Sequence, residues 1–373
     1  MAFAYTPGLR VADRTMVRKE RRLPLSGETL VKEGDTVTAE TVVARTELPG
    51  NVQMLNISNI LGLPPGDIPE LLHVEEGAEI GEGQILGQSK GLFGLFKNTV
   101  RSPIRGVFES YNRITGQAVL REPPIPVEID AYLRGTVTGV LRNEGVIVES
   151  VATFVQGIFG IGGETRGELK TLTSGPDQEL TEDLIDESCR DRILLGGSFV
   201  SFATLNKAIR NGVRAIIVGG FDDKDLKEFL GYDLGVAITG HEKKGITLIL
   251  TEGFGRMDMA RETFELLRSR EGMLASVNGA TQIRAGVMRP EVVIPVEGEE
   301  SERSSEKQAG AMDIGSRVRC IRAPYFGRLG TVAALPAELQ VLDSEARVRV
   351  LDVKFEDGKT VTVPRANVEL IEE

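Results

Sequence analysis

Cysteine, histidine and tryptophan are scarce in this sequence. Its 373 residues include two cysteines, two histidines and no tryptophan, and aromatic residues make up only 5%. Two cysteines, Cys189 and Cys320, are too few for a disulfide framework or a four-cysteine zinc site. Neither His73 nor His241 has a cysteine or carboxylate near it at metal-ligand spacing. We therefore expect no metal site.

Long apolar runs and the common catalytic motifs are also missing. No stretch approaches the about 20 apolar residues that span a bilayer, and the first ten residues lack the apolar core of a signal peptide. The sequence contains no dinucleotide-binding or P-loop glycine motif, no nucleophile elbow and no zinc-protease motif. These absences predict a cytoplasmic, non-enzymatic protein with no transmembrane segment, catalytic residue or cofactor.

The charge balance is acidic. The chain has 44 lysines and arginines against 55 aspartates and glutamates, a formal net charge of −11. Wrapping nucleic acid requires an excess of cationic side chains to neutralise phosphates, so the total disfavours that function. Two local basic runs, at 10–22 and 317–328, still allow a local contact.

Changes in composition divide the chain. Residues 297–312 are acidic, serine-rich and poor in large apolar residues, which predicts a flexible linker. Gly175 and Pro176 mark a second boundary, where the pattern changes from strand-like to helix-like. The predicted fold is multi-domain, mostly β plus α/β: a β domain at 1–174, an α/β domain at 181–296 and a small barrel at 313–373.

The first segment contains a degenerate repeat of glycine turns and short strands. One copy occupies 31–52 and the other occupies 74–116. This pattern resembles the barrel-sandwich hybrid fold of biotinyl and lipoyl carrier domains. By that resemblance, a hairpin should present a modified lysine where this chain has Leu95, while Lys90 and Lys97 lie out of register. The resemblance therefore implies the fold without the biotin or lipoate.

An apolar hairpin tip, GLFGLF, lies within the second copy. Its large side chains are Leu92, Phe93, Leu95 and Phe96, and Lys90 and Lys97 flank it. One interpretation is that these side chains fold back onto their own barrel. The other is an exposed tip that docks on a partner or a membrane surface.

The middle segment alternates strand and helix patterns. Apolar runs at 192–195, 215–218, 234–238 and 246–250 predict strands, and 202–209, 222–230 and 257–269 predict helices. This order favours a parallel sheet, whose ligands sit at the carboxyl ends of the strands. The glycine-rich turns there could bind a ligand or simply be tight turns. They contain Gly196, Gly197, Ser198, Gly219 and Gly220.

The last segment predicts five short strands in an SH3-like barrel. Gly315, Val318, the run 323–327, Gly330 and Val332 resemble the KOW motif of ribosomal proteins and transcription elongation factors. The resemblance implies that the loop of this barrel contacts RNA, the ribosome or polymerase. Aromatic side chains would stack on bases and arginines would bind phosphates, or the same surface would dock a protein. The candidate residues are Arg319, Arg322, Tyr325, Phe326 and Arg328.

These patterns together predict a modular binding protein that bridges components of a macromolecular assembly. The KOW-like segment is the most specific resemblance and favours the transcription or translation machinery. One alternative is an accessory or scaffold subunit of a large protein complex, docked through the GLFGLF hairpin. Another is a ligand-sensing or enzymatic α/β domain. The sequence leaves the oligomeric state open.

Overall fold

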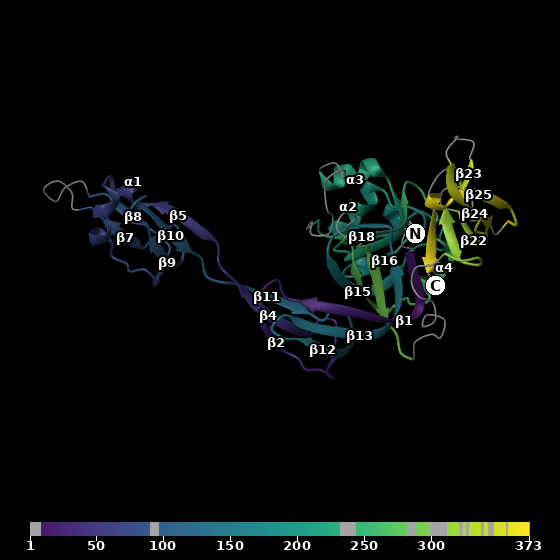
Figure 1. Cartoon of the computed structure of the whole chain (residues 1–373), viewed down its shortest axis with the longest axis horizontal. Coiled ribbons are helices and arrows are strands. Elements are labelled where there is room, and N and C mark those ends of the chain that lie inside the picture. Colours follow the sequence, from purple (N-terminus) through teal and green to yellow (C-terminus); the bar gives the residue numbers. More distant parts are fainter. Residues whose placement is uncertain are drawn as a thin grey trace.

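The computed structural model describes residues 9–89, 97–231, 244–281, 288–298, 312–320, 324–325, 328–336, 339–341, 347–355 and 357–372. The predicted linker at 297–312 therefore falls almost wholly outside the described residues, as does the strand predicted at 234–238. The fold is mostly β, as predicted, and the α-helices within the described residues are few and short. Figure 1 shows an elongated molecule with a small domain at one end and a larger body at the other.

The small domain, residues 51–121, is called the distal domain below. Its main sheet is antiparallel in the order β5-β10-β9-β6, and a β7–β8 hairpin and helix α1 pack beside it. The buried core is its own, and Phe108 and Leu120 at its centre are fully buried. The elements are β5 (Val52–Asn56), α1 (Ile57–Leu61), β6 (Ala78–Ile80), β7 (Ile85–Gln88), β8 (Thr99–Arg101), β9 (Gly106–Tyr111) and β10 (Gln117–Arg121).

Two antiparallel strands connect the distal domain to the body. β4 (Val42–Leu48) leads into the distal domain and β11 (Ile125–Asp130) returns from it, with Leu48 opposite Ile125. The short strand β2 (Glu28–Thr29) pairs with the other edge of β4. We call β4 and β11 the arm, and Figure 1 shows it between the two parts of the molecule.

The base of the arm rests on a second antiparallel sheet. β1 (Leu9–Arg22) and β12 (Gly135–Leu141) both pair with β13 (Gly145–Gln156), and β3 (Thr36–Val37) pairs with β12. Apolar residues of the arm and of this sheet, including Val43, Val137 and Val148, share one core. The chain therefore leaves this core through β4 and re-enters it through β11, so the distal domain is an insertion.

The middle of the chain forms a sheet with four parallel strands. β15 (Glu164–Thr171), β16 (Ile193–Leu195), β17 (Ala215–Phe221) and β18 (Thr247–Phe254) pair in that order. Alternate residues of these strands enter two separate cores, one on each face, which explains their continuous apolar runs. Helices α2 (Phe202–Arg210) and α3 (Asp223–Leu230) cover one face, and α4 (Arg261–Arg268) covers the other.

Antiparallel strands extend this sheet in two directions. β14 (Phe159–Ile161) pairs with β18, while β19 (Leu274–Asn278) pairs with β15. β20 (Glu291–Pro295) then joins β19 to β13, so the body is built on one continuous hydrogen-bonded network. β14 and β15 precede the boundary predicted at 174–181, so the predicted division cuts through the sheet.

The carboxyl-terminal segment forms a compact β unit with its own core, which includes Val332, Leu351 and Phe355. Its central strand order is β26-β21-β22-β24-β25, and β23 pairs with the first three residues of β24. Strand β1 pairs in parallel with β26 through Leu9, which ties the two ends of the described chain together. The strands are β21 (Arg317–Cys320), β22 (Leu329–Ala334), β23 (Leu339–Val341), β24 (Arg347–Phe355), β25 (Thr360–Pro364) and β26 (Val368–Glu372).

Candidate functional site

The predicted contact residues of the carboxyl-terminal unit begin with Arg319, which the structure buries. Its side chain is 3% exposed and lies between the carboxylates of Glu252 and Glu369, which are 6% and 3% exposed. Arg319 donates to Glu369 at 2.9 Å and to the carbonyl oxygen of Thr251 at 3.1 Å. The expectation that Arg319 presents its charge to a partner is therefore corrected: the guanidinium is used inside the protein.

Arg289 completes this group, bonding to Glu369 at 2.9 Å. We call Glu252, Arg289, Arg319 and Glu369 the carboxyl-terminal ion-pair cluster. Burial by itself lowers the pKa of Arg319, but the charges of Glu252 and Glu369 outweigh it, so the pKa lies above its ordinary value. Because Glu252 is on β18 and Glu369 on β26, this cluster fixes the carboxyl-terminal unit to the parallel sheet.

Tyr325 and Arg328 pack against the carboxyl-terminal unit that carries them. The ring of Tyr325 lies 5.5 Å from that of Phe355, and the guanidinium of Arg328 lies 3.9 Å from the same ring. Arg328 also pairs with Asp357 at 2.6 Å, and this side chain remains 38% exposed. Arg322 and Phe326 lie outside the described residues. Of the predicted set, Arg328 therefore keeps an exposed charge, already shared with Asp357.

The strands on either side of the predicted docking hairpin show where it leaves the distal domain. Leu92, Phe93, Leu95 and Phe96 lie outside the described residues. β7 and β8, which precede and follow them, pair with each other in the distal domain, with Gln88 opposite Thr99. The chain therefore enters and leaves this hairpin at the end of the molecule remote from the parallel sheet (Figure 1).

The glycine-rich turns at the carboxyl ends of the parallel strands are buried under other segments. The amide of Ser198 donates to the carbonyl of Gln178 at 2.9 Å, and that of Gly219 donates to Gly197 at 2.8 Å. Gly196 donates in the same way to Ile217. These amides therefore donate to carbonyl groups of the protein's own backbone. In the structure, the turns predicted to bind a ligand are tightly packed against neighbouring segments.

Replacing Gly220 with alanine tests that interpretation. A Cβ at Gly220 would lie 2.0 Å from the carbonyl oxygen of Gly255, so the backbone around Gly255 must move. We expect a loss of roughly 1–3 kcal/mol or more of unfolding free energy, measured by urea denaturation. Gly255→Ala is no suitable control, since its own φ is +95°. Ser201→Thr keeps the α2 cap and should be nearly neutral. Unchanged stability of Gly220→Ala would contradict the packing role.

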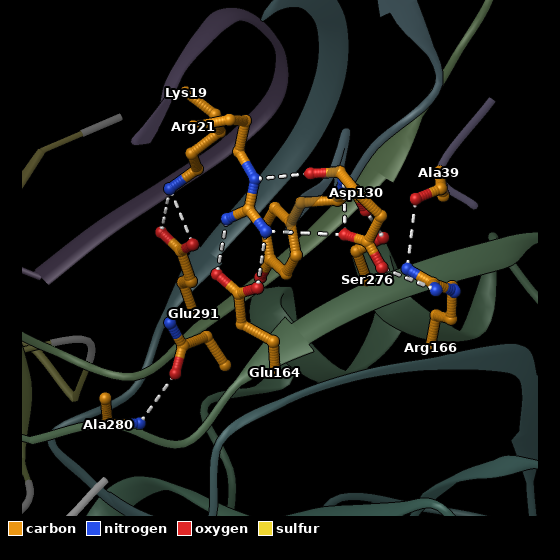
Figure 2. A network of polar contacts seen from close by, with 11 residues as sticks. Lys19, Arg21, Ala39, Asp130, Glu164, Arg166, Ser276, Ala280 and Glu291 are labelled. Atoms are coloured by element: carbon orange, nitrogen blue, oxygen red, sulfur yellow. Dashed lines mark hydrogen bonds and ion pairs between the residues drawn. The ribbon is translucent and has the colours of Figure 1, made fainter. Parts of the chain in front are cut away.

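A polar network that the sequence did not single out joins the arm to the body (Figure 2). Lys19 and Arg21 lie two residues apart on β1, so they point to the same face. Lys19 pairs with Glu291 at 2.5 Å, and Arg21 pairs with Glu164 at 2.7 Å and with Asp130 at 3.3 Å. The basic run at 10–22 is thus neutralised internally at these positions rather than offered to phosphates.

Arg166 extends this network to the arm. It donates to Asp130 at 2.7 Å and to the carbonyl oxygen of Ala39 at 3.0 Å. We call Lys19, Arg21, Asp130, Glu164, Arg166 and Glu291 the junction network. Only the period-two spacing of charges in the basic run could have indicated it, because its acids come from β11, β15 and β20.

Tyr132 is enclosed by the junction network. Its side chain is 2% exposed, and its φ of +68° is rare for a residue other than glycine. The charges of Lys19 and Arg21 lie 5.8 Å and 5.3 Å from its ring centre. Burial and the charge of Glu291 raise the pKa of Tyr132 well above its ordinary value, so the phenol stays neutral.

Two shallow polar grooves run along the arm. One of about 590 Å³ lies beside the junction network, and one of about 750 Å³ crosses the β2–β4–β11 face. Both include Glu128. Within the described part of the chain, no three histidine, cysteine, aspartate or glutamate side chains are grouped to hold a metal ion. Cys189 and Cys320 are buried, and burial raises the pKa of the Cys320 thiol.

Comparison with known proteins adds no constraint on function. A scan against protein-family models and a search of curated proteins gave no match to this chain. None of the helices in the described segments is long and apolar enough to cross a membrane.

Proposed function

We propose that this chain is a non-enzymatic, modular binding protein that bridges components of a macromolecular assembly in the cytoplasm. The observation that carries the proposal is the arm. β4 and β11 hold the distal domain, with its own core, away from the body, while the carboxyl-terminal ion-pair cluster fixes the carboxyl-terminal unit to the body. Such a molecule presents separate surfaces at a defined separation, which is what a bridging protein needs.

We assign the modules by the resemblances found in the sequence. These are a barrel-sandwich hybrid-like domain within 1–174, a parallel α/β domain within 181–296 and a KOW or SH3-like barrel within 313–373. The transcription or translation machinery is the favoured assembly because of the KOW resemblance. Protein contacts are favoured over direct RNA binding, since Arg319 is buried and Arg328 already pairs with Asp357.

A second candidate is an accessory or scaffold subunit docked through the GLFGLF hairpin. The position of β7 and β8 in the distal domain favours it, because an insertion on an arm can reach a partner without obstruction by the body. The third alternative, a ligand-sensing or enzymatic α/β domain, has less support because the turns around Gly197 and Gly219 bond to neighbouring backbone.

Affinity capture of the full chain from native lysate, with and without nuclease, tests the proposal. We expect ribosome or polymerase subunits to be enriched, and to remain after nuclease treatment if the contacts are protein contacts. Arg328→Glu should reduce capture through the carboxyl-terminal unit. Phe93→Ser combined with Phe96→Ser should reduce capture through the hairpin. Lys354→Gln, on the exposed side of β24, is the matched control for Arg328→Glu. Enrichment of neither machine would count against the proposed assembly.

A further inference from the structure

Strand β5 is one edge of the main sheet of the distal domain. In the described part of the chain, β5 pairs with β10 alone, so its other side is open. Val52 and Met54 are 49% and 59% exposed. Their side chains share a face because they are two residues apart in a strand. The result is an open edge flanked by exposed apolar side chains.

The hydrogen-bond register shows which backbone groups face outward. The amide of Glu122 donates to the carbonyl oxygen of Asn51 at 2.9 Å, which makes these two residues a hydrogen-bonded pair. In an antiparallel ladder such pairs alternate, so the groups of Gln53 and Leu55 also point toward β10. The N–H and C=O groups of Val52 and Met54 therefore point away from the sheet and can accept another strand.

The edge lacks the features by which proteins protect such strands. β5 reads Val-Gln-Met-Leu-Asn, with no charged residue, no proline and no register shift in its pairing. The opposite edge of the same sheet, β6, carries the exposed Glu79. A two-fold contact places a strand against its own copy, so a charge near its centre faces a like charge. β5 avoids that repulsion.

We propose that β5 pairs antiparallel with β5 of a second copy of this chain, so that the distal domains form a symmetric dimer. With Met54 on the two-fold axis, Met54 faces its own counterpart and Val52 faces Asn56 of the second copy. The arm supports this arrangement because it holds the distal domain, and β5 with it, away from the body (Figure 1). The inference is independent of the bridging function and adds an oligomeric state to it.

Sedimentation velocity of the full chain over a range of concentrations tests the proposal. We expect a reversible dimer that is lost in Met54→Pro, because proline removes an outward N–H and leaves the ladder with β10 intact. Glu79→Gln, on the protected edge, should dimerise like the parent chain. A monomer at every concentration, or a dimer that survives Met54→Pro, would overturn the proposal.

Cysteine cross-linking checks the register and guards against a misfolded proline variant. In a hydrogen-bonded antiparallel pair the Cα atoms lie about 5.5 Å apart, within the range for a disulfide. Met54→Cys should therefore give a covalent dimer on mild oxidation. Val52→Cys should not, because its copies are offset by roughly 14 Å at about 3.4 Å per residue. The native Cys189 and Cys320 are buried and contribute little background. Equal cross-linking of both variants, or attachment of Met54→Cys to a different protein, would refute the pairing.

Discussion

Replacing Arg319 with alanine should destabilise the body by about 3–5 kcal/mol, because the carboxylate of Glu252 would stay buried without its counter-charge and Glu369 would keep only Arg289. Removing one partner of a buried ion pair costs more than the pair contributes, since desolvation of the remaining charge is no longer offset. We expect the carboxyl-terminal unit to lose its fixed position on β18. Chemical denaturation measures the free energy, and limited proteolysis after residue 312 reports the release.

Arg317→Ala is the matched control for this prediction. Arg317 is also on β21 and pairs with Glu262, but their side chains are 26% and 67% exposed. An exposed pair contributes about 0–1 kcal/mol, so this variant should remain near the parent stability. Combining Arg319→Met with Glu252→Gln removes both charges of that ion pair, leaves Arg289 paired with Glu369, and should recover part of the loss. Similar stabilities for Arg319→Ala and Arg317→Ala would show that the cluster does not hold the unit.

Phe108→Ala should unfold the distal domain and leave the body intact. Phe108 is fully buried at the centre of the distal core, and truncating a buried phenylalanine costs about 3–5 kcal/mol. A domain of this size has little stability to spare, and its core is separate from those of the body. Hydrogen exchange should show lost protection in β9 and β10 and unchanged protection in β16 and β17.

Phe264→Ala provides the converse experiment. Phe264 is also fully buried, but it lies on α4 against the parallel sheet. Its truncation should reduce protection in β16 and β17 and leave β9 and β10 as they were. If either substitution reduced protection in both regions equally, the distal domain and the body would form one cooperative unit, and the arm would not be a spacer between modules.

The general character of the fold follows from local patterns. Short apolar alternations between glycines predict the mostly β chain that the structure has. The helix predicted at 222–230 is observed as α3 (Asp223–Leu230), where Asp222 caps the first turn and Gly231 ends the helix with a φ of +84°. These signals are local, because a cap, a turn glycine and a period of alternation each act within a few residues.

The division of the chain into domains was harder to predict from the sequence. The two copies of the repeat are similar in sequence, yet one contributes to the arm and its base while the other forms part of the distal domain. Whether a repeat continues a domain or is inserted into one depends on which distant strands pair, here Leu48 with Ile125. The same reason explains the boundary at 174–181, which β15 crosses by pairing with β16.

The sequence by itself determined the strand content, the turns, the absence of familiar catalytic motifs and the apolar character of the strands β15–β18. Tertiary structure decided which charged side chains are paired inside the protein. Arg319 and Arg21 belong to the two basic runs of the sequence and read there as surface cations, but Glu252 and Glu164 reach them from strands far along the chain. A charge is neutralised through space, over a few ångströms, so its role is fixed only when folding selects its neighbours.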